Sequence, residues 1–322
     1  MLRAGRRTLH GLLLLVGVSL FSFVLLSLAP GNFYDELRLN PQISPETVAA
    51  VKAQYGMDRP MPVRYWRWIL SLGKGEFGYS LLYRRTVGSL LWPRARNTLL
   101  LTGLATLLAW AVALPWGIFE ALHRGGWIDR TGGALTALLL AIPDVLLGLL
   151  LLLLAAKTGW FPTGGMASVG TEGDALPARI WDVGRHLFLP VLALVLGTLP
   201  LLARHVRSAM IVALESPFVL AARAHGFSRV RVICRHALPA AMNSLISLFG
   251  FSIGGLLSMS MLMEIVLGWP GLGPLVLEAM LARDIYVVMA AVMLSSVFLI
   301  AGNLLADALL YWNDPRIREI SP

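Results

Sequence analysis

The chain has 322 residues, of which 57% are hydrophobic and only 14% carry a charged side chain. This apolar share is larger than the core of a single soluble domain can bury, which excludes an ordinary soluble domain. The net charge of +9 comes from basic residues spread between long apolar runs, which argues against a nucleic-acid surface. Cys234 is the single cysteine, so no intramolecular disulfide can form.

The first predicted element is a membrane span close to the N-terminus. Three arginines, at positions 3, 6 and 7, precede an apolar run from Leu12 to Ala29. This run is longer than the roughly 7 to 15 apolar residues of a cleavable signal peptide, so we expect a retained signal anchor. Cleavage after Ser27-Leu28-Ala29, which resembles a signal-peptidase site, is the alternative.

Five further apolar runs are long enough to cross a bilayer. A hydrocarbon core about 30 Å thick needs about 20 mostly apolar helical residues, because a helix satisfies its own backbone hydrogen bonds where water is absent. The sequence therefore predicts an all-α integral membrane protein with about six transmembrane helices. They are expected at Leu12–Ala29, Thr98–Phe119, Ala134–Ala156, Leu187–Ala203, Ala240–Met263 and Ile285–Leu310.

Basic residues in the connecting segments predict the orientation of these helices, because lysine and arginine in short loops tend to stay cytoplasmic. The N-terminus is expected inside the cell, and so is the C-terminus after six crossings. Residues 204–239 then fall inside, with six arginines against Glu215 as the single acid. The predicted parts are an N-terminal segment with the first helix (1–29), an external region with short helices (30–96), a five-helix core (97–312) that includes the inner loop 204–239, and a cytoplasmic tail (313–322).

The external region from residue 30 to 96 has its own local order. Ser44-Pro45-Glu46 predicts a helix start and Gly56 a stop, around a short helix from Thr47 to Tyr55. Tyr65-Trp66-Arg67-Trp68 mixes aromatic and basic side chains, as expected along the outer membrane surface. A docking site for another protein and an ordinary folded loop are both compatible with this region.

Residues that could carry catalysis are few. The six histidines lie near predicted helix ends or in loops, without the spacing of metal ligands on one helix face. Gly73-Lys74-Gly75 lacks the spaced first glycine of a phosphate-binding loop. We therefore expect no catalytic residue, no metal site and no cofactor bound by this chain.

Asp144 is the one acid near the middle of a predicted span, directly after Pro143 in the third. An ionisable residue inside a membrane is costly unless it faces a cavity or a partner. It could meet a cationic group of a solute in a translocation pathway, or it could bond backbone groups that the proline leaves free. A single acid also argues against a carrier driven by protons or sodium, which needs several buried coordinating groups.

The fifth predicted helix carries a stripe of small and polar residues. Their spacing of three or four residues places them on one helix face. The stripe could line a solvent-filled passage of the translocation pathway, or it could be a close-packing seam between helices. Its members are Asn243, Ser247, Gly250, Gly254 and Ser258.

The inner loop contains a predicted short helix from Pro217 to His225. Ser216 is a suitable N-cap, Pro217 fits the first helical position, and Gly226 provides a stop. About nine residues are too few for a helix that is stable alone in water, so a membrane surface or a groove of a partner protein must hold it. Phe218 offers an apolar anchor, and the neighbouring alanines allow a partner to approach closely.

This loop resembles the Glu-Ala-Ala, Gly, Ile-x-Leu-Pro signature of permease subunits of bacterial ATP-binding-cassette (ABC) importers. Leu220-Ala221-Ala222 lead after three residues to Gly226, and His236-Ala237-Leu238-Pro239 follow nine residues later. Leu220 stands where the family has glutamate and His236 where it has isoleucine, so the first position has no acid that could form an ion pair with the ATPase. The resemblance implies that the helix is a coupling helix docked on the ATPase through Phe218, Leu220, Ala221, Ala222, Arg223, Ala224 and Gly226.

Other stretches are similar to the subfamily that imports dipeptides, oligopeptides or nickel complexes, and they extend over nearly the whole chain. They are Gly56-Met57-Asp58-Arg59-Pro60, Gly78-Tyr79-Ser80, Arg96-Asn97-Thr98-Leu99, Gly268-Trp269-Pro270-Gly271-Leu272-Gly273, Ala282-Arg283-Asp284 and Asp314-Pro315-Arg316-Ile317-Arg318. The chain departs from the family at Asn32, where an acid is frequent, and at Asp144, where a small polar residue is commoner. The second departure bears on the choice of solute.

The resemblance implies a type I permease fold in the bacterial inner membrane, and one permease subunit of an ABC importer as the function. The implied partners are a second homologous permease, two cytosolic ATPases that bind ATP and magnesium, an external solute-binding protein and the lipid bilayer, with no nucleic acid. Peptides or similar small solutes are expected, with nickel chelates as the alternative inside the family. A stand-alone carrier and a membrane-embedded enzyme are the alternatives from other classes, and the enzyme lacks a convergent nucleophile, base or metal site.

Overall fold

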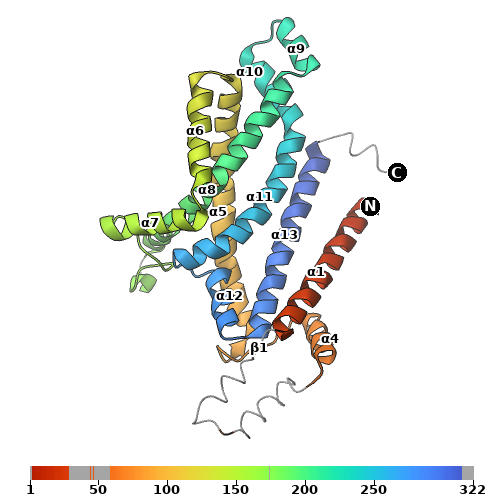
Figure 1. The fold of residues 1–322 in the computed structure, drawn as a ribbon, viewed down its shortest axis with the longest axis vertical. Coiled ribbons are helices and arrows are strands. Elements are labelled where there is room, and N and C mark those ends of the chain that lie inside the picture. The colour runs from red at the N-terminus through yellow and green to blue at the C-terminus, as the bar shows by residue number, and fades with distance from the viewer. Residues whose placement is uncertain (1, 29–43, 45, 47–58, 174, 314–322) are drawn as a thin grey trace. The chain divides into compact units, whose positions relative to one another are not determined.

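The computed structural model describes residues 2–28, 44, 46, 59–173 and 175–313. The predicted short helix from Thr47 to Tyr55 lies outside these residues, and so do positions 314–322 of the tail. The described chain is almost entirely helical, as the apolar runs predicted (Figure 1).

Five helices are long and apolar enough to cross a membrane, and a bent pair of helices makes a sixth candidate. The prediction of an all-α membrane protein with about six spans is therefore confirmed. The five helices are α1 (Leu2–Leu28), α5 (Val87–Leu122), α8 (Leu176–Leu214), the continuous stretch from α10 (Arg229–Val232) to α11 (Leu238–Val266), and α13 (Ile285–Asn313).

The third predicted span, Ala134–Ala156, is wrong as a continuous helix. It is divided into α6 (Trp127–Ala141) and α7 (Asp144–Thr158), which are bent by 93° at the break. Pro143 disfavours helical geometry in the residue before it, and Ile142 is indeed extended, with φ −89° and ψ 119°. Hydropathy alone could not show this break, because both arms are apolar.

The described residues form two compact units, and the first contains residues 1–97 and 270–298. It holds α1, α4 (Met61–Leu72), the antiparallel pair β1 (Tyr79–Ser80) and β2 (Arg85–Thr86), and α12 (Leu272–Leu281). Its core joins Phe23, Trp68 and Met289. Within the stretch Tyr65-Trp66-Arg67-Trp68, which is expected along the membrane surface, Trp68 is only 3% exposed and belongs to this core, whereas Trp66 is 62% exposed.

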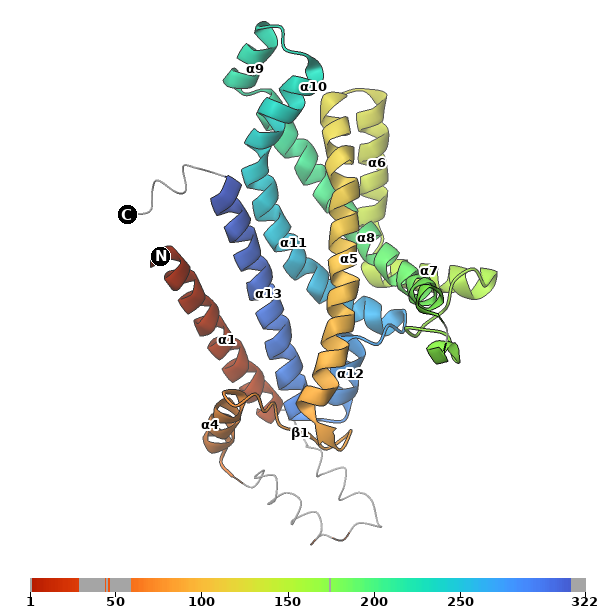
Figure 2. The same cartoon turned by 180° about the vertical axis from the view of Figure 1, so that it is seen from behind.

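The second unit contains the described residues of the ranges 98–269 and 299–313. Leu101, Ala105, Ala109 and Ala113 of α5 recur every four residues, so one helix face packs into the core with α8 and α11. At Gly117 an added Cβ would lie 2.6 Å from the carbonyl oxygen of Ala203, so the backbones of α5 and α8 are in close contact there. α6 lies along α5 in both views (Figure 1 and Figure 2).

Two boundaries differ from the expected organisation. α5 begins at Val87, so the predicted external region 30–96 ends in the first turns of a long helix. α8 continues to Leu214, so the first part of the predicted inner loop 204–239 is helical and belongs to a span. Both helices continue beyond their apolar centres through charged residues. The hydropathy pattern had placed these residues outside the predicted spans.

Candidate functional site

The predicted short helix is present as α9 (Pro217–Ala224). Pro217 occupies its first turn, and its C-terminal turn closes with hydrogen bonds from the N–H of His225 to Ala221 O (3.0 Å) and from the N–H of Gly226 to Arg223 O (3.0 Å). Gly226 has φ +78°, the left-handed conformation that ends many helices and favours glycine. Ser216 occupies the N-cap position, but its hydroxyl donates to Ala213 O (2.6 Å) and does not cap the helix.

α9 has one face against its own chain and one face open. Val219 and Ala222 are 0% and 6% exposed, and Val219 packs in a cluster with the ends of α8 and α11. Ala222 therefore cannot offer the docking surface expected of it, because the helix period turns it inward with Val219. The other predicted coupling residues are exposed: Phe218, Leu220, Ala221, Arg223, Ala224 and Gly226.

The segment after α9 is held by ring contacts. The guanidinium of Arg231 lies 5.5 Å from the ring centre of Phe227, and the ring of His236 stacks on the same ring at 5.7 Å. A π-helical turn from Ile233 to Ala237 then leads into α11. Pro239 has no N–H to offer the carbonyl four residues earlier, which is a physical reason for this wider turn.

Two ion pairs connect the turn between α5 and α6 to the end of α8, directly before α9. Arg207 donates from Nε and Nη2 to the two carboxylate oxygens of Asp129, at 2.6 Å and 2.9 Å. The backbone N–H of Gly125 donates to the same carboxylate at 2.8 Å. Arg124 pairs with Glu215, the last residue but one before α9 begins. We call these two ion pairs the anchoring ion pairs of α9, because they fix α8, the helix that leads into α9.

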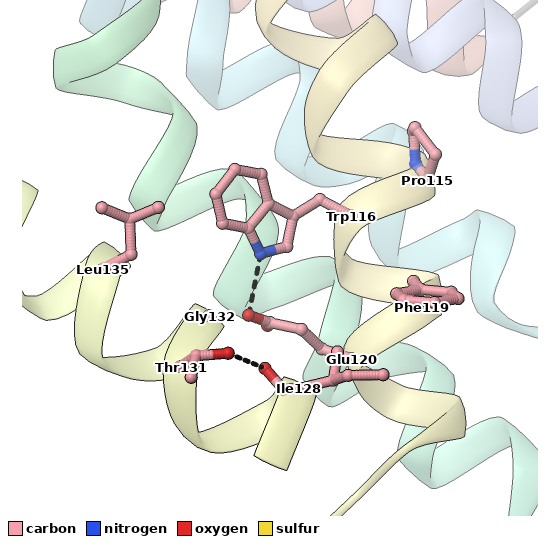
Figure 3. A pocket seen from close by; sticks show the side chains of 8 residues that line it. All are labelled: Pro115, Trp116, Phe119, Glu120, Ile128, Thr131, Gly132 and Leu135. Carbon is pink, nitrogen blue, oxygen red and sulfur yellow. Dashed lines mark hydrogen bonds between the residues drawn. The ribbon is translucent and has the colours of Figure 1, made fainter. Parts of the chain in front are cut away.

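A cavity of about 470 Å³ lies between α5 and α6, and a buried acid lies beside it (Figure 3). Glu120 is 2% exposed and accepts a hydrogen bond from Trp116 Nε1 at 2.8 Å. An added Cβ on Gly132 would lie only 1.9 Å from Glu120 Oε1, so the glycine makes room for this carboxylate. The remaining lining is largely apolar, from Pro115, Phe119, Ile128, Thr131 and Leu135.

A second buried acid lies near the end of α11. Glu264 is 0% exposed, and the hydroxyl of Thr98 donates to it at 2.6 Å. Sequence reasoning missed both buried acids, because the predicted spans stopped at Phe119 and Met263, one residue before each. The sequence signal that could have shown them is that apolar residues continue at helical spacing beyond each of the two acids. Across the described residues, no group of three His, Cys, Asp or Glu side chains could hold a metal ion.

Asp144 is the first residue of α7, at the break in the bent span. Its carboxylate is exposed and makes no hydrogen bond within the described ranges, so the alternative of bonding to freed backbone groups is not what the structure has. A negative charge at this position is favoured by the positive end of the α7 dipole. Oδ1 lies near Gly197 of α8, where an added Cβ would be 2.9 Å away.

The stripe on α11 divides into two parts. An added Cβ on Gly250 would lie 2.7 Å from Ala306 Cβ, and one on Gly254 would lie 2.5 Å from Leu299 Cδ1. Asn243 accepts a hydrogen bond from Asn313 Nδ2 at 3.0 Å. These three residues therefore pack against α13, as the seam alternative describes, whereas Ser247 and Ser258 are exposed.

Comparison with known proteins places this arrangement in a family. Residues 113–319 match the family model of the binding-protein-dependent transport system inner membrane component, and residues 1–95 match its N-terminal model. The oligopeptide transport system permease protein AppB of Bacillus subtilis is 36% identical, over 97% of this chain and 98% of that protein.

Two further relatives cover nearly the same length. The glutathione transport system permease protein GsiC of Salmonella paratyphi A is 35% identical, over 95% of this chain and 94% of its own. The dipeptide transport system permease protein DppB of Escherichia coli is 33% identical, over 94% and 95%.

A solved structure shows the same fold. A chain of the inward-facing MetNI methionine ABC transporter matches with a TM-score of 0.57 and 20% identity, over 70% of this chain and 96% of that one. The family match, the apolar helices and the isolated α9 agree with one another. The chain belongs to the family of binding-protein-dependent transport system inner membrane components, and it is a multi-pass inner-membrane permease subunit of an ABC importer and not an enzyme.

Proposed function

We propose that this permease passes peptides or similar small solutes delivered by an external binding protein. The support is the agreement among its relatives, which are named for oligopeptides, dipeptides and glutathione, itself a tripeptide. A nickel chelate or another small solute is the alternative inside the family. Uptake of a labelled dipeptide, competed by unlabelled dipeptide but not by a nickel chelate, is the expected result.

The proposed assembly pairs this chain with a second homologous permease, two cytosolic ABC ATPases and an external solute-binding protein. ATP and magnesium are bound by the ATPases, and this chain binds no cofactor of its own. Both termini face the cytoplasm, which the arginine-rich segments 3–7 and 223–235 favour. This orientation places α9 on the side where the ATPases lie.

The observation that carries the proposal is the open face of α9. A helix of eight residues is not stable alone, and Val219 and Ala222 already attach one side of it to the permease. Beside this attached side, Phe218 and Leu220 are about half exposed, at 52% and 49%, and they lie on the two flanks of the helix, because residues two positions apart do not share a face. A short helix with exposed apolar side chains on both flanks fits a groove of the ATPase.

Movement of α9 is transmitted to the helices through the anchoring ion pairs. When ATP closes the ATPases, a docked α9 moves with them as a rigid body, and binding energy at one site becomes a shift at another. Arg124–Glu215 and Arg207–Asp129 connect the root of α9 to α5 and α6. The pathway candidates that remain exposed are Asp144, Ser247 and Ser258, with Asp144 suited to a cationic group of the solute.

Cysteine crosslinking tests the docking of α9. Cys234, the native cysteine, is exposed and is first replaced by serine. In this background Phe218→Cys should crosslink to the ATPase in working membranes, whereas Val219→Cys, one residue along but 0% exposed, should not. Absence of any crosslink from Phe218→Cys, with uptake intact, would falsify the proposed docking.

A further inference from the structure

We propose that a basic pocket beside α9 binds the phosphate group of an anionic phospholipid. The pocket has a volume of about 540 Å³. Leu122 and His123, at the end of α5, form one wall, and Arg223, Phe227 and Arg229, at the end of α9 and the start of α10, form the other. Val232 and Ile233 complete its lining.

The arginines of the pocket lack acidic partners, because the nearby acids are bonded elsewhere. Glu215 pairs with Arg124, Asp129 pairs with Arg207, and Glu120 accepts from Trp116. Neither Arg223 nor Arg229 makes an ion pair with any residue that the structure describes. Two guanidinium groups without counter-charge in one pocket favour an anion, and their planar fork suits phosphate oxygens.

His123 adds a third polar group to the same pocket. Its Nδ1 lies 2.9 Å from the carbonyl oxygen of Phe119, and a carbonyl can only accept, so Nδ1 carries the proton. Nε2 is therefore the ring nitrogen that can accept a hydrogen bond.

The position of the pocket indicates a lipid as the source of the phosphate. α5 is a membrane span that ends at Leu122, and another span of the same unit, the stretch from α10 to α11, begins at Arg229. Residues at the ends of spans lie at the depth of the lipid headgroups. Basic pockets between helices at this depth suit anionic headgroups.

The apolar part of the lining separates a lipid from a free anion. Leu122 is 40% exposed and Val232 and Ile233 lie beside it, so the pocket joins apolar surface to positive charge. The pocket volume is many times the roughly 30 Å³ that one water occupies, so the pocket is larger than a small ion needs. The phosphodiester of a phospholipid can pair with the arginines, and the first carbons of its acyl chains can pack against the apolar lining.

Of the expected coupling residues of α9, the pocket includes Arg223 alone. Phe218 and Leu220, which the proposed ATPase contact uses, are not part of its lining. A bound lipid would connect Arg223 at the end of α9 to His123 at the end of α5 while the docking face stays free. The inference therefore does not rest on the identity of the solute.

Lipid retention tests the proposal. The full-length chain with its partner subunits is placed in nanodiscs of phosphatidylcholine with or without phosphatidylglycerol, and retained phosphatidylglycerol is counted by native mass spectrometry. Arg229→Gln should weaken retention about fivefold, the typical effect of one basic residue near a charged membrane. Arg229→Lys, which keeps the charge but not the fork, should lie between this variant and the unchanged protein.

Arg204→Gln is the matched control, because Arg204 is an exposed arginine of α8 outside the pocket and should leave retention unchanged. His123→Gln, at the opposite wall, provides a second test if Arg229→Gln fails to fold. Equal retention in the Arg229, His123 and Arg204 variants would overturn the proposal. Inorganic phosphate binding that depends on Arg229, without lipid retention, would also overturn the proposal, because it would assign the pocket to a soluble anion. Loss of ATPase co-purification in Arg229→Gln, with lipid retention intact, would overturn it too, because it would assign the pocket to a protein carboxylate.

Discussion

At the scale of single residues, Gly226 is limited by its backbone and not by space. Its φ is +78°, and an added Cβ would meet nothing within 4 Å. Gly226→Val should therefore cost about 1–2 kcal/mol of conformational strain at the end of α9. We expect loss of ATPase co-purification with normal membrane insertion. Gly226→Asn is the control, because asparagine tolerates the left-handed region, and equal co-purification of both variants would count against the coupling role.

The adjacent glycines 132 and 133 of α6 give a second test at this scale. Gly132→Ala would force the carboxylate of Glu120 away from its bond with Trp116, and overpacking of this kind costs about 1–3 kcal/mol (Figure 3). Gly133 has nothing within 4 Å, so Gly133→Ala should be neutral or stabilise α6 by up to about 1 kcal/mol. Thermal unfolding of the two purified variants separates these effects. A lower midpoint for Gly133→Ala than for Gly132→Ala would show that the described packing is wrong.

Individual residues also show what sequence reasoning can reach. Asp144 was found because an acid interrupts an apolar run, and α9 was found because its start and stop residues are local signals. Glu120 and Glu264 were missed, since an acid at the edge of an apolar run looks like the end of a span until a partner such as Trp116 or Thr98 is seen. Ala222 is counted among the coupling residues in the sequence analysis, but it lies one turn from Val219 on the buried side of α9.

At the scale of helices, the stripe on α11 tests whether small residues make a passage or a seam. Gly254→Leu would drive a side chain into Leu299, whereas at Gly255, one residue along, an added Cβ meets nothing within 4 Å. We expect Gly254→Leu to lower the thermal midpoint of the protein by the equivalent of about 1–3 kcal/mol, with little change for Gly255→Leu. Normal stability of Gly254→Leu combined with complete loss of transport would instead favour a passage.

The anchoring ion pairs of α9 give a second test at the scale of helices. Asp129→Asn leaves Arg207 without its charged partner in a partly buried site, which should cost about 1–3 kcal/mol. If the pair transmits movement, solute uptake per ATP hydrolysed should fall more than ATPase assembly does. The exchange Asp129→Arg with Arg207→Asp restores opposite charges and should recover part of the coupling. An exchange variant no better than Asp129→Asn would mean that charge pairing is not the property that matters.

Prolines show why span boundaries were harder to predict than span number. Pro190 and Pro200 lie inside α8, which continues through both of them, and both are buried among neighbouring helices that hold the backbone. Pro143 is exposed, and the chain breaks there into α6 and α7. The same residue type therefore has opposite outcomes, and the difference is tertiary packing, which a hydropathy profile does not contain.

At the scale of the molecule, stretches that carried the family resemblance supply buried bonds within each unit. In the first unit, the hydroxyl of Ser80 donates to Asp284 Oδ2 at 2.6 Å, and Asn97 Nδ2 donates to Pro270 O at 2.8 Å. In the second, Thr98 holds Glu264. Family likeness could thus be seen in sequence, but the partners of these residues, up to 204 positions apart, could not.

The energy source is the property of the whole assembly that follows from these contacts. A self-driven carrier needs several buried ionisable groups free to bind ions, but Glu120 and Glu264 are bonded to Trp116 and Thr98, and Asp144 is exposed. We therefore expect the purified chain alone in vesicles to move no labelled dipeptide. The complete assembly should take it up only with ATP, and vanadate should stop it. Uptake by the single chain without nucleotide would contradict this, because the driving force would then have to lie within its own helices and not in a partner that pulls on α9.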